Sequence, residues 1–256
     1  MKPASSHLVL AVLVAVAFCL PGTTMSAEDP YPATTRTPAQ WIEGKDEFTS
    51  HLSCPAYGSE KDGVVAIYCQ AEIDIRGETT SSLCFSKPVD SNHRHLRATR
   101  RAYRKVNYSP ATINGEPVEV LAYASAYFVT KGGNCTAFGF PNWGLSANAL
   151  GSTDYISPQE ISHDGGWVGK TQSMMRAARP RFLNRAGTAF SFSADISNGG
   201  AASNVRIVSN PIGLSEDELE QVVGAYSDSS FIPGHLDGEP QAMPILEVFY
   251  LPPPAR

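Results

Sequence analysis

The side chains that could carry out chemistry in this 256-residue chain are few and far apart. His163 precedes Asp164 in the run His-Asp-Gly-Gly-Trp, and a histidine held by a carboxylate can act as a general base. A hydrolase that uses the middle segment around His163 and Asp164 is therefore one hypothesis. However, the sequence contains no GxSxG elbow, no HExxH motif and no phosphate-binding loop. The sequence favours a protein that is not an enzyme and that uses no metal and no cofactor.

The N-terminus has the features of a secretory signal. Lys2 supplies a positive charge, residues 8–20 are continuously apolar, and Pro21-Gly22 precedes small residues up to Ala27. Thirteen apolar residues are too few to cross a bilayer as a helix, which takes about 20. We expect a signal peptide at residues 1–27 and no stable membrane span; an uncleaved anchor or a buried helix is the alternative.

The overall composition excludes one class of partner. The chain carries 20 Lys plus Arg against 25 Asp plus Glu, a formal net charge of −5. A nucleic-acid-binding protein needs a basic excess to neutralise phosphates. We therefore expect no nucleic-acid partner.

The chain contains an internal repeat at an offset of 123 residues. Residues 66–128 align with residues 189–251 without a gap, with 14 identities in 63 positions. A match that keeps register through turns indicates homologous modules. After the signal peptide we expect these segments: an N-terminal extension (28–62), module 1 (63–130), a Gly-containing connecting segment (131–185) and module 2 (186–252).

Each module has the pattern of an α+β fold. Apolar residues alternate with mostly polar ones in the first segment of each module, which is the period of a half-buried strand. In module 2, Ser215 and Glu218 form a capping box ahead of an apolar helix face, and Asn92 is the corresponding cap candidate in module 1. The pattern predicts two tandem modules, each a three-stranded antiparallel sheet with one packed helix in the order strand-strand-helix-strand. The strands are expected at residues 67–73, 82–86 and 118–129, and at 190–196, 205–209 and 241–250.

The repeat also favours one pairing of the cysteines at positions 54, 69, 84 and 135. Cys69 and Cys84 align with Phe192 and Ile207, which face the core of the equivalent hairpin. A Cys69–Cys84 disulfide would replace that cross-strand pair, and it leaves Cys54 to bond Cys135. In a secreted protein such bonds persist, so we expect two structural disulfides.

The modules resemble a known family. Module 2 contains Phe231-Ile-Pro-Gly-His-Leu-Asp-Gly-Glu-Pro240, module 1 contains Tyr108-Ser-Pro110 and Asn114-Gly-Glu-Pro117, and both are similar to the TonB C-terminal domain. The likeness covers about half of the chain. It implies a periplasmic location, a link to envelope transport, and a free sheet edge that accepts an extended peptide of a cell-envelope protein by strand pairing. The residues that would offer this edge lie on the third strand of module 2: Gln241, Met243, Ile245, Glu247 and Phe249. A structural envelope protein with one degenerate module is the alternative.

The two modules differ in charge. Residues 63–129 carry a net charge of +2, whereas residues 186–252 carry −8. The difference is concentrated in the two expected helices. The basic one offers Arg94, Arg97, Arg100, Arg101 and Arg104 as partner-binding candidates. These residues could face the acidic helix of module 2, either within one chain or in a homodimer, or could contact an anionic surface; two unrelated solvated faces are the alternative.

Overall fold

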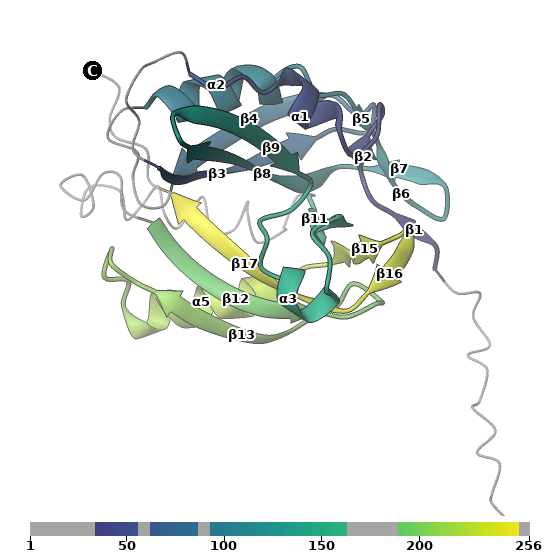
Figure 1. The fold of residues 1–256 in the computed structure, drawn as a ribbon. Coiled ribbons are helices and arrows are strands. Elements are labelled where there is room, and N and C mark those ends of the chain that lie inside the picture. Colours follow the sequence, from purple (N-terminus) through teal and green to yellow (C-terminus); the bar gives the residue numbers. More distant parts are fainter. Residues whose placement is uncertain (1–33, 56–61, 87–92, 163–188, 251–256) are drawn as a thin grey trace, which may run out of the picture. The chain divides into compact units, whose positions relative to one another are not determined.

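The computed structural model describes residues 34–55, 62–86, 93–162 and 189–250, which belong to a compact unit that begins at Thr34 (Figure 1). The unit is α+β, with mostly strands in several small antiparallel sheets and few helices, as expected. The sheet that contains β3, β4 and β8 has six strands, however, and not the three expected for module 1, because strands from outside residues 63–130 add to it. The expected signal peptide, Asn92 and the pair His163–Asp164 all lie outside the described residues. Within the described ranges, no helix is long and apolar enough to cross a membrane.

The largest sheet, here called the main sheet, has six strands. Its path is β14-β11-β8-β3-β4, and β9 pairs with β8 beside this path. The long strands are β3 (Gly63–Ile73), β4 (Thr79–Ser86) and β8 (Val120–Lys131). Residues 125–131 of β8 pair with β9 (Asn134–Phe140), and Val120 and Leu121 pair with β11 (Gln159–Ile161), which in turn pairs with β14 (Phe231–Ile232). The edge of β8 that faces away from β3 is thus filled by two later segments of the same chain.

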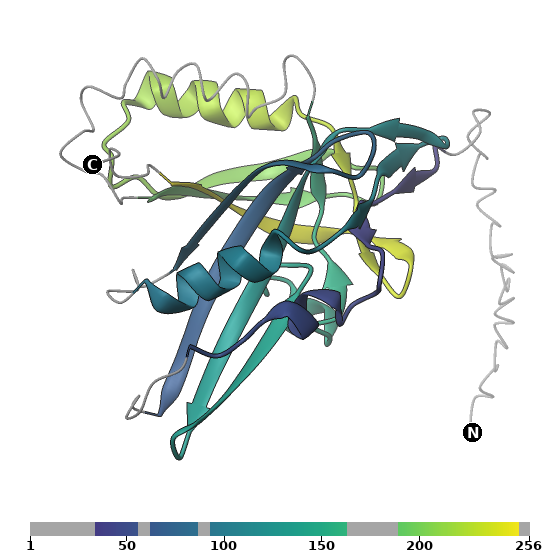
Figure 2. The same cartoon turned by 90° about the horizontal axis from the view of Figure 1, so that it is seen from above.

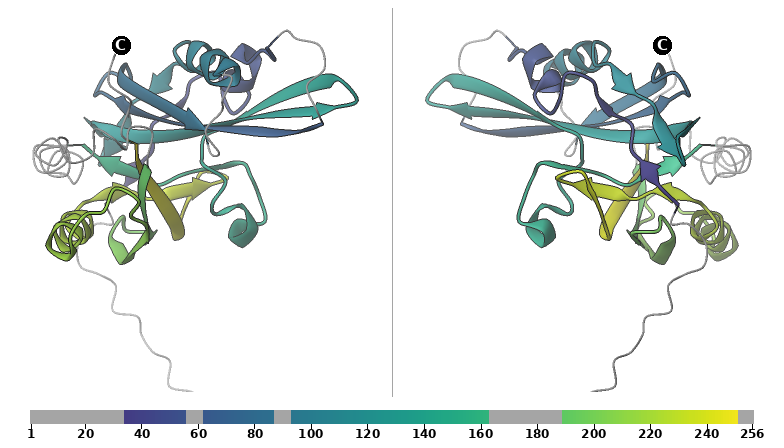
Figure 3. Two further views of the ribbon diagram at one scale, coloured as in Figure 1. Left: turned by 90° about the vertical axis from the view of Figure 1, so that its left-hand side faces the viewer. Right: turned by 90° about the vertical axis from the view of Figure 1, so that its right-hand side faces the viewer.

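Both faces of the main sheet are covered. One face packs against α1 (Glu47–His51) and α2 (Arg94–Tyr103) through a core that includes Phe48, Ile67 and Tyr103. The opposite face contributes Tyr123 and other aromatic residues to a core shared with the C-terminal part of the chain (Figure 3). Because both faces are covered, nearly every residue of β8 is buried rather than every second one.

A second sheet, here called the C-terminal sheet, has three strands in the order β13-β12-β17. Its strands are β12 (Ala189–Ile196), β13 (Ala202–Ser209) and β17 (Met243–Tyr250). Helix α5 (Glu216–Ser227) runs along this sheet, as α2 runs along the main sheet (Figure 2). The capping box predicted at Ser215 and Glu218 is present at the start of α5.

The described chain has two corresponding parts, residues 63–131 with strands β3, β4 and β8, and residues 189–250 with strands β12, β13 and β17. Their strand registers follow the offset of 123. Cys69 lies opposite Cys84 and Ala124, and Phe192 lies opposite Ile207 and Glu247. Gly77 and Gly200 have φ values of +82° and +78°, and a Cβ on either would come within 2.1 Å and 2.0 Å of a backbone carbonyl oxygen, that of Tyr108 or that of Phe231. Only glycine fits such a site without strain. The same backbone approach therefore occurs at both positions of the repeat.

Short strands from the ends of the two parts form two further three-stranded sheets. One has the order β1-β6-β7 and the other β10-β15-β16. Each contains a tight hairpin, with Asn114-Gly115 or Asp237-Gly238 at positive φ. The strands are β1 (Arg36–Thr37), β6 (Ala111–Ile113), β7 (Glu116–Val118), β10 (Tyr155–Ile156), β15 (Gly234–Leu236) and β16 (Glu239–Gln241), and the remaining pair is β2 (Gln40–Trp41) with β5 (Tyr108–Ser109).

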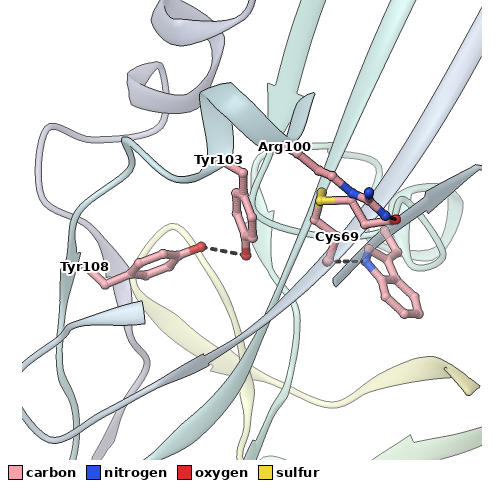
Figure 4. Close-up of a disulfide and its surroundings, with 6 residues drawn as sticks. Cys69, Arg100, Tyr103 and Tyr108 are labelled. Atoms are coloured by element: carbon pink, nitrogen blue, oxygen red, sulfur yellow. Dashed lines mark hydrogen bonds between the residues drawn. A yellow bond between two sulfur atoms is a disulfide. The ribbon is translucent and has the colours of Figure 1, made fainter. Parts of the chain in front are cut away.

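The two predicted disulfide pairings are confirmed. Cys69 and Cys84 lie directly opposite each other in the β3–β4 hairpin, with their Cα atoms 4.1 Å apart. Cys54 bonds Cys135 of β9 at a Cα–Cα distance of 6.0 Å. Figure 4 shows the first disulfide beneath α2, close to Arg100 and the buried hydroxyl pair Tyr103–Tyr108, whose oxygens are 2.9 Å apart.

Candidate functional site: the edges of the C-terminal sheet

The third strand, on which a partner-binding edge was predicted, lies inside the protein. Met243, Ile245 and Glu247 are buried, and Gln241 and Phe249 are half-buried. No residue of β17 whose burial is described is exposed. Gln241 ends β16, whereas Ile245 and Phe249 of β17 pack in the core that also contains residues of α5.

The backbone of β17 is also partly occupied. Pro244 has no N–H to donate, and its carbonyl oxygen accepts a hydrogen bond of 2.9 Å from Ser146 Oγ, just before α3 (Ala147–Leu150). Val248 is buried in the same cluster as Trp143 and Tyr123, which come from the first part of the chain. The segment after β9 and the aromatic residues of the main sheet therefore cover this strand.

The opposite edge of the same sheet has a different environment. β13 is the terminal strand, and in the described part of the chain it pairs as a strand with β12 alone. Arg206 and Val208 are exposed, and 56% of the Val208 surface is accessible. Asn204, with φ of 51°, accompanies a register irregularity at the start of the strand. A second register irregularity lies at Val208, between the pairs Phe192–Ile207 and Ser191–Ser209, so β13 is an exposed but bulged edge. An unpaired edge of this kind is a template for strand pairing.

The corresponding strand of the main sheet has a partner for one of its carbonyls. The guanidinium of Arg100 on α2 donates a 3.0 Å hydrogen bond to the carbonyl oxygen of Cys84 in β4. The residues 123 positions later are Val223 and Ile207, and a valine side chain cannot donate. The hydrogen bond from the helix to a carbonyl of β4 thus has no counterpart at the equivalent position of β13.

Buried acidic and phenolic groups meet where the two parts join. Tyr123 OH donates a hydrogen bond to Glu247, and Ser229 Oγ donates one of 3.4 Å to Glu160 Oε1. Burial raises the pKa of Glu247, the hydrogen bond from Tyr123 lowers it and the nearby Glu160 carboxylate raises it, with a net pKa of about 8. Burial likewise raises the pKa of Tyr226 well above its usual value. The cluster joins β8, β11, α5 and β17, and its burial keeps it from meeting a substrate.

A cavity of about 520 Å³ lies between residues 34–45 and the β10-β15-β16 sheet. Trp41, Ile156 and Pro240 line it, and a 2.7 Å ion pair between Lys45 and Asp154 lies among the lining residues. Burial lowers the pKa of His235, another lining residue, whose Nδ1 is 3.0 Å from the carbonyl oxygen of Pro233. The described lining residues include this ion pair but no set of converging catalytic groups, so the cavity has the size of a ligand site without catalytic machinery among these residues.

Four of the five predicted basic residues lie on α2, and Arg104 directly follows its last residue. Arg97, Arg100, Arg101 and Arg104 are exposed, and Arg94 is half-buried. The acidic helix α5 lies on the other side of the main sheet (Figure 3). The direct contact expected between the two helices within one chain does not form, because the main sheet separates them.

The sequence did not predict the short strands that pair with the edges of the two modules. β9, β10 and β11 come from residues 131–185, for which the sequence predicted only a connecting segment, and β1 and β2 come from the N-terminal extension. The alternation in Asn-Cys-Thr-Ala-Phe at the start of β9 was an available signal, whereas β11 has three residues and no local one. Across the described residues, no group of three or more His, Cys, Asp or Glu side chains could hold a metal ion.

Comparisons of the chain with protein-family models, with curated proteins and with solved structures find no match.

Proposed function

We propose that the protein is a secreted, non-enzymatic binding protein of the bacterial periplasm that captures an extended peptide segment of a cell-envelope protein by strand pairing. The observation that carries the proposal is the exposed edge of β13 in a sheet whose other edge strand, β17, is buried. In strand addition, main-chain hydrogen bonds supply affinity and side-chain contacts supply selectivity. Disulfides of the observed kind persist in such an oxidising compartment.

The proposal includes the origin of the fold as two tandem modules similar to the TonB C-terminal domain. Equal registers at an offset of 123 support it, as do the equivalent glycines Gly77 and Gly200. A further correspondence supports a longer repeated unit. Before the first module, β1 pairs with β6 and β2 pairs with β5. Before the second module, β10 pairs with β15 and β11 pairs with β14 in the same way. On this interpretation each module begins with a two-strand arm.

The proposed site differs from the one that the family resemblance implied. There the third strand would receive the peptide, but here β17 is covered by Ser146, Trp143 and Tyr123. The available edge is therefore β13. The first module, whose third strand β8 is paired along most of its outer edge, serves as the support of the second.

A peptide selection tests this function even though the natural partner is unidentified. Random extended peptides displayed on phage are selected against the immobilised protein, and the affinity of the selected peptides is measured for two variants, Val208→Lys and Val64→Lys. Both valines are exposed, at 56% and 62%, but Val64 lies at the start of β3. A lysine on an exposed edge opposes strand pairing.

We expect Val208→Lys to weaken the selected peptides at least about tenfold and Val64→Lys to leave them unchanged. Failure to select any extended peptide, or equal effects of the two variants, would refute the function.

A further inference from the structure

The exposed side of α2 carries a line of positive charges. Arg97, Arg101, Arg104 and Lys105, here called the arginine stripe, are all exposed. Arg97 and Arg101, four residues apart, lie on one side of α2. Arg104 and Lys105 directly follow the C-terminal end of the helix. The buried side of α2, which includes Thr99 and Tyr103, packs against the main sheet and so fixes the stripe toward solvent.

These charges are not neutralised by the described part of the protein. Helix α2 contains no acidic residue, and the one ion pair between described side chains is Lys45–Asp154, away from α2. No side-chain hydrogen bond is formed by the four stripe residues within the described ranges, in contrast to Arg100, which is bonded to Cys84. The acidic helix α5 lies across the main sheet (Figure 3).

The chemistry of the stripe favours one kind of partner. The guanidinium fork matches the oxygens of phosphate and carboxylate groups. Specific protein interfaces have an apolar centre, whereas every fully exposed residue of α2 is a charged one. A convex helix side with cations and no apolar anchor fits an extended layer of phosphates better than a protein groove.

We propose that the arginine stripe of α2 docks the protein on an anionic phospholipid surface. The attraction is electrostatic, with about 1 kcal/mol for each Arg or Lys near such a surface. The stripe lies on α2 and the exposed β13 edge lies on a different sheet, so a docked molecule keeps its strand-pairing edge accessible. The inference does not depend on the proposed function.

The test is sedimentation of the purified protein with vesicles of equal parts phosphatidylglycerol and phosphatidylcholine, and with vesicles of phosphatidylcholine alone. We expect binding to the first and not to the second. Raising the salt from about 0.1 M to about 0.5 M shortens the Debye length from about 10 Å to about 4 Å and should release the protein.

Two double variants with the same change in net charge separate the stripe from overall charge. Arg97→Gln with Arg101→Gln should weaken vesicle binding roughly 30-fold. Lys131→Gln with Arg76→Gln removes two exposed cations elsewhere and should change it less than about threefold.

Three results would overturn the proposal. They are no sedimentation with the anionic vesicles at low salt, equal losses for the two double variants, and tighter binding to a poly-glutamate peptide than to the vesicles. The last result would assign the stripe to an acidic protein instead.

Discussion

Both parts of the compact unit place a helix over a β-hairpin and a returning third strand, but they differ in how the edges of that sheet are treated. In the first part, β9 and β11 pair with the outer edge of β8, and Arg100 holds a carbonyl of β4. In the second part, β17 is covered by side chains, and β13 is exposed. The two sheets thus differ in which of their edge strands is exposed, and the proposed strand pairing depends on this difference.

The cores beneath the two helices differ in their polar groups. Tyr103 is hydrogen-bonded to the hydroxyl of Tyr108, and the residues 123 positions later are Tyr226 and Phe231. Phe231 has no hydroxyl, and the acidic pair Glu160 and Glu247 lies beside Tyr226 instead. Buried polar groups need hydrogen-bond partners, so the replacement of one polar core residue by an apolar one requires further replacements around it.

The disulfides give the largest difference between the two parts. Loss of the Cys54–Cys135 bond, which closes a separation of 81 residues, should lower the free energy of unfolding by about 4.5 kcal/mol, and loss of Cys69–Cys84, with a separation of 15, by about 3 kcal/mol. Urea unfolding of the two double Cys→Ala variants measures both. A larger loss for the Cys69–Cys84 pair would contradict this order.

The second prediction concerns the backbone approach that both parts share. Gly200→Ala should destabilise by about 3 kcal/mol, because it adds a clash with the Phe231 carbonyl to the cost of a positive φ. Gly77→Ala should cost a similar amount. The matched control is Gly238→Ala, with φ of +86° but open space around the added Cβ, which should cost only about 1 kcal/mol. Equal losses for Gly200 and Gly238 would show that the close approach is absent.

The third prediction concerns the acidic pair of the second part. The pKa of Glu247 is raised in the folded state to about 8 from an ordinary value of 4.5, so the folded state binds the proton more tightly. Its contribution to stability is fully present below about pH 4.5 and is lost as the pH rises through about 8. Between pH 5 and pH 9, the wild type should therefore lose on the order of 4 kcal/mol more than the variant Glu247→Gln. Parallel urea-midpoint profiles for the two proteins would contradict the raised pKa.

The smallest expected effects are at the helix starts. Ser215→Ala removes the capping box of α5 and should cost about 1 kcal/mol. His93, the residue before α2, has φ of 50°, and its side chain makes no capping hydrogen bond. His93→Gly relieves the left-handed backbone and should stabilise by about 0.5 kcal/mol. Thermal unfolding should thus shift in opposite directions, and a loss of stability in both variants would refute the contrast.

Local patterns in the sequence predicted the repeated elements. The alternation in β3 and β12, the capping box at Ser215 and the Asn-Gly and Asp-Gly turns each depend on neighbouring residues. The repeat then predicted the disulfides, because Cys69 and Cys84 align with Phe192 and Ile207, which were expected to form a cross-strand pair.

The covering of the edges could not be predicted in this way. β11 has three residues, and its pairing with β8 joins Glu160 to Leu121, which depends on long-range packing. The burial of Glu160 and Glu247 contradicts the usual exposure of acidic residues. The sequence predicted the partner-binding edge on β17 because the outer edge of this strand would be free in a single module, and the packing that covers it comes from distant segments.

Hydrogen exchange of the free protein tests most directly which edge is open. In a terminal strand, every second amide points away from its neighbour and is protected only if something covers it. The account predicts that the outward amides of residues 205–209 in β13 exchange in the fastest class, whereas the amides of β17 and of residues 125–131 in β8 exchange slowly. If the outward amides of β13 exchange as slowly as those of β17, the second part has no open edge, and the proposed strand pairing is contradicted.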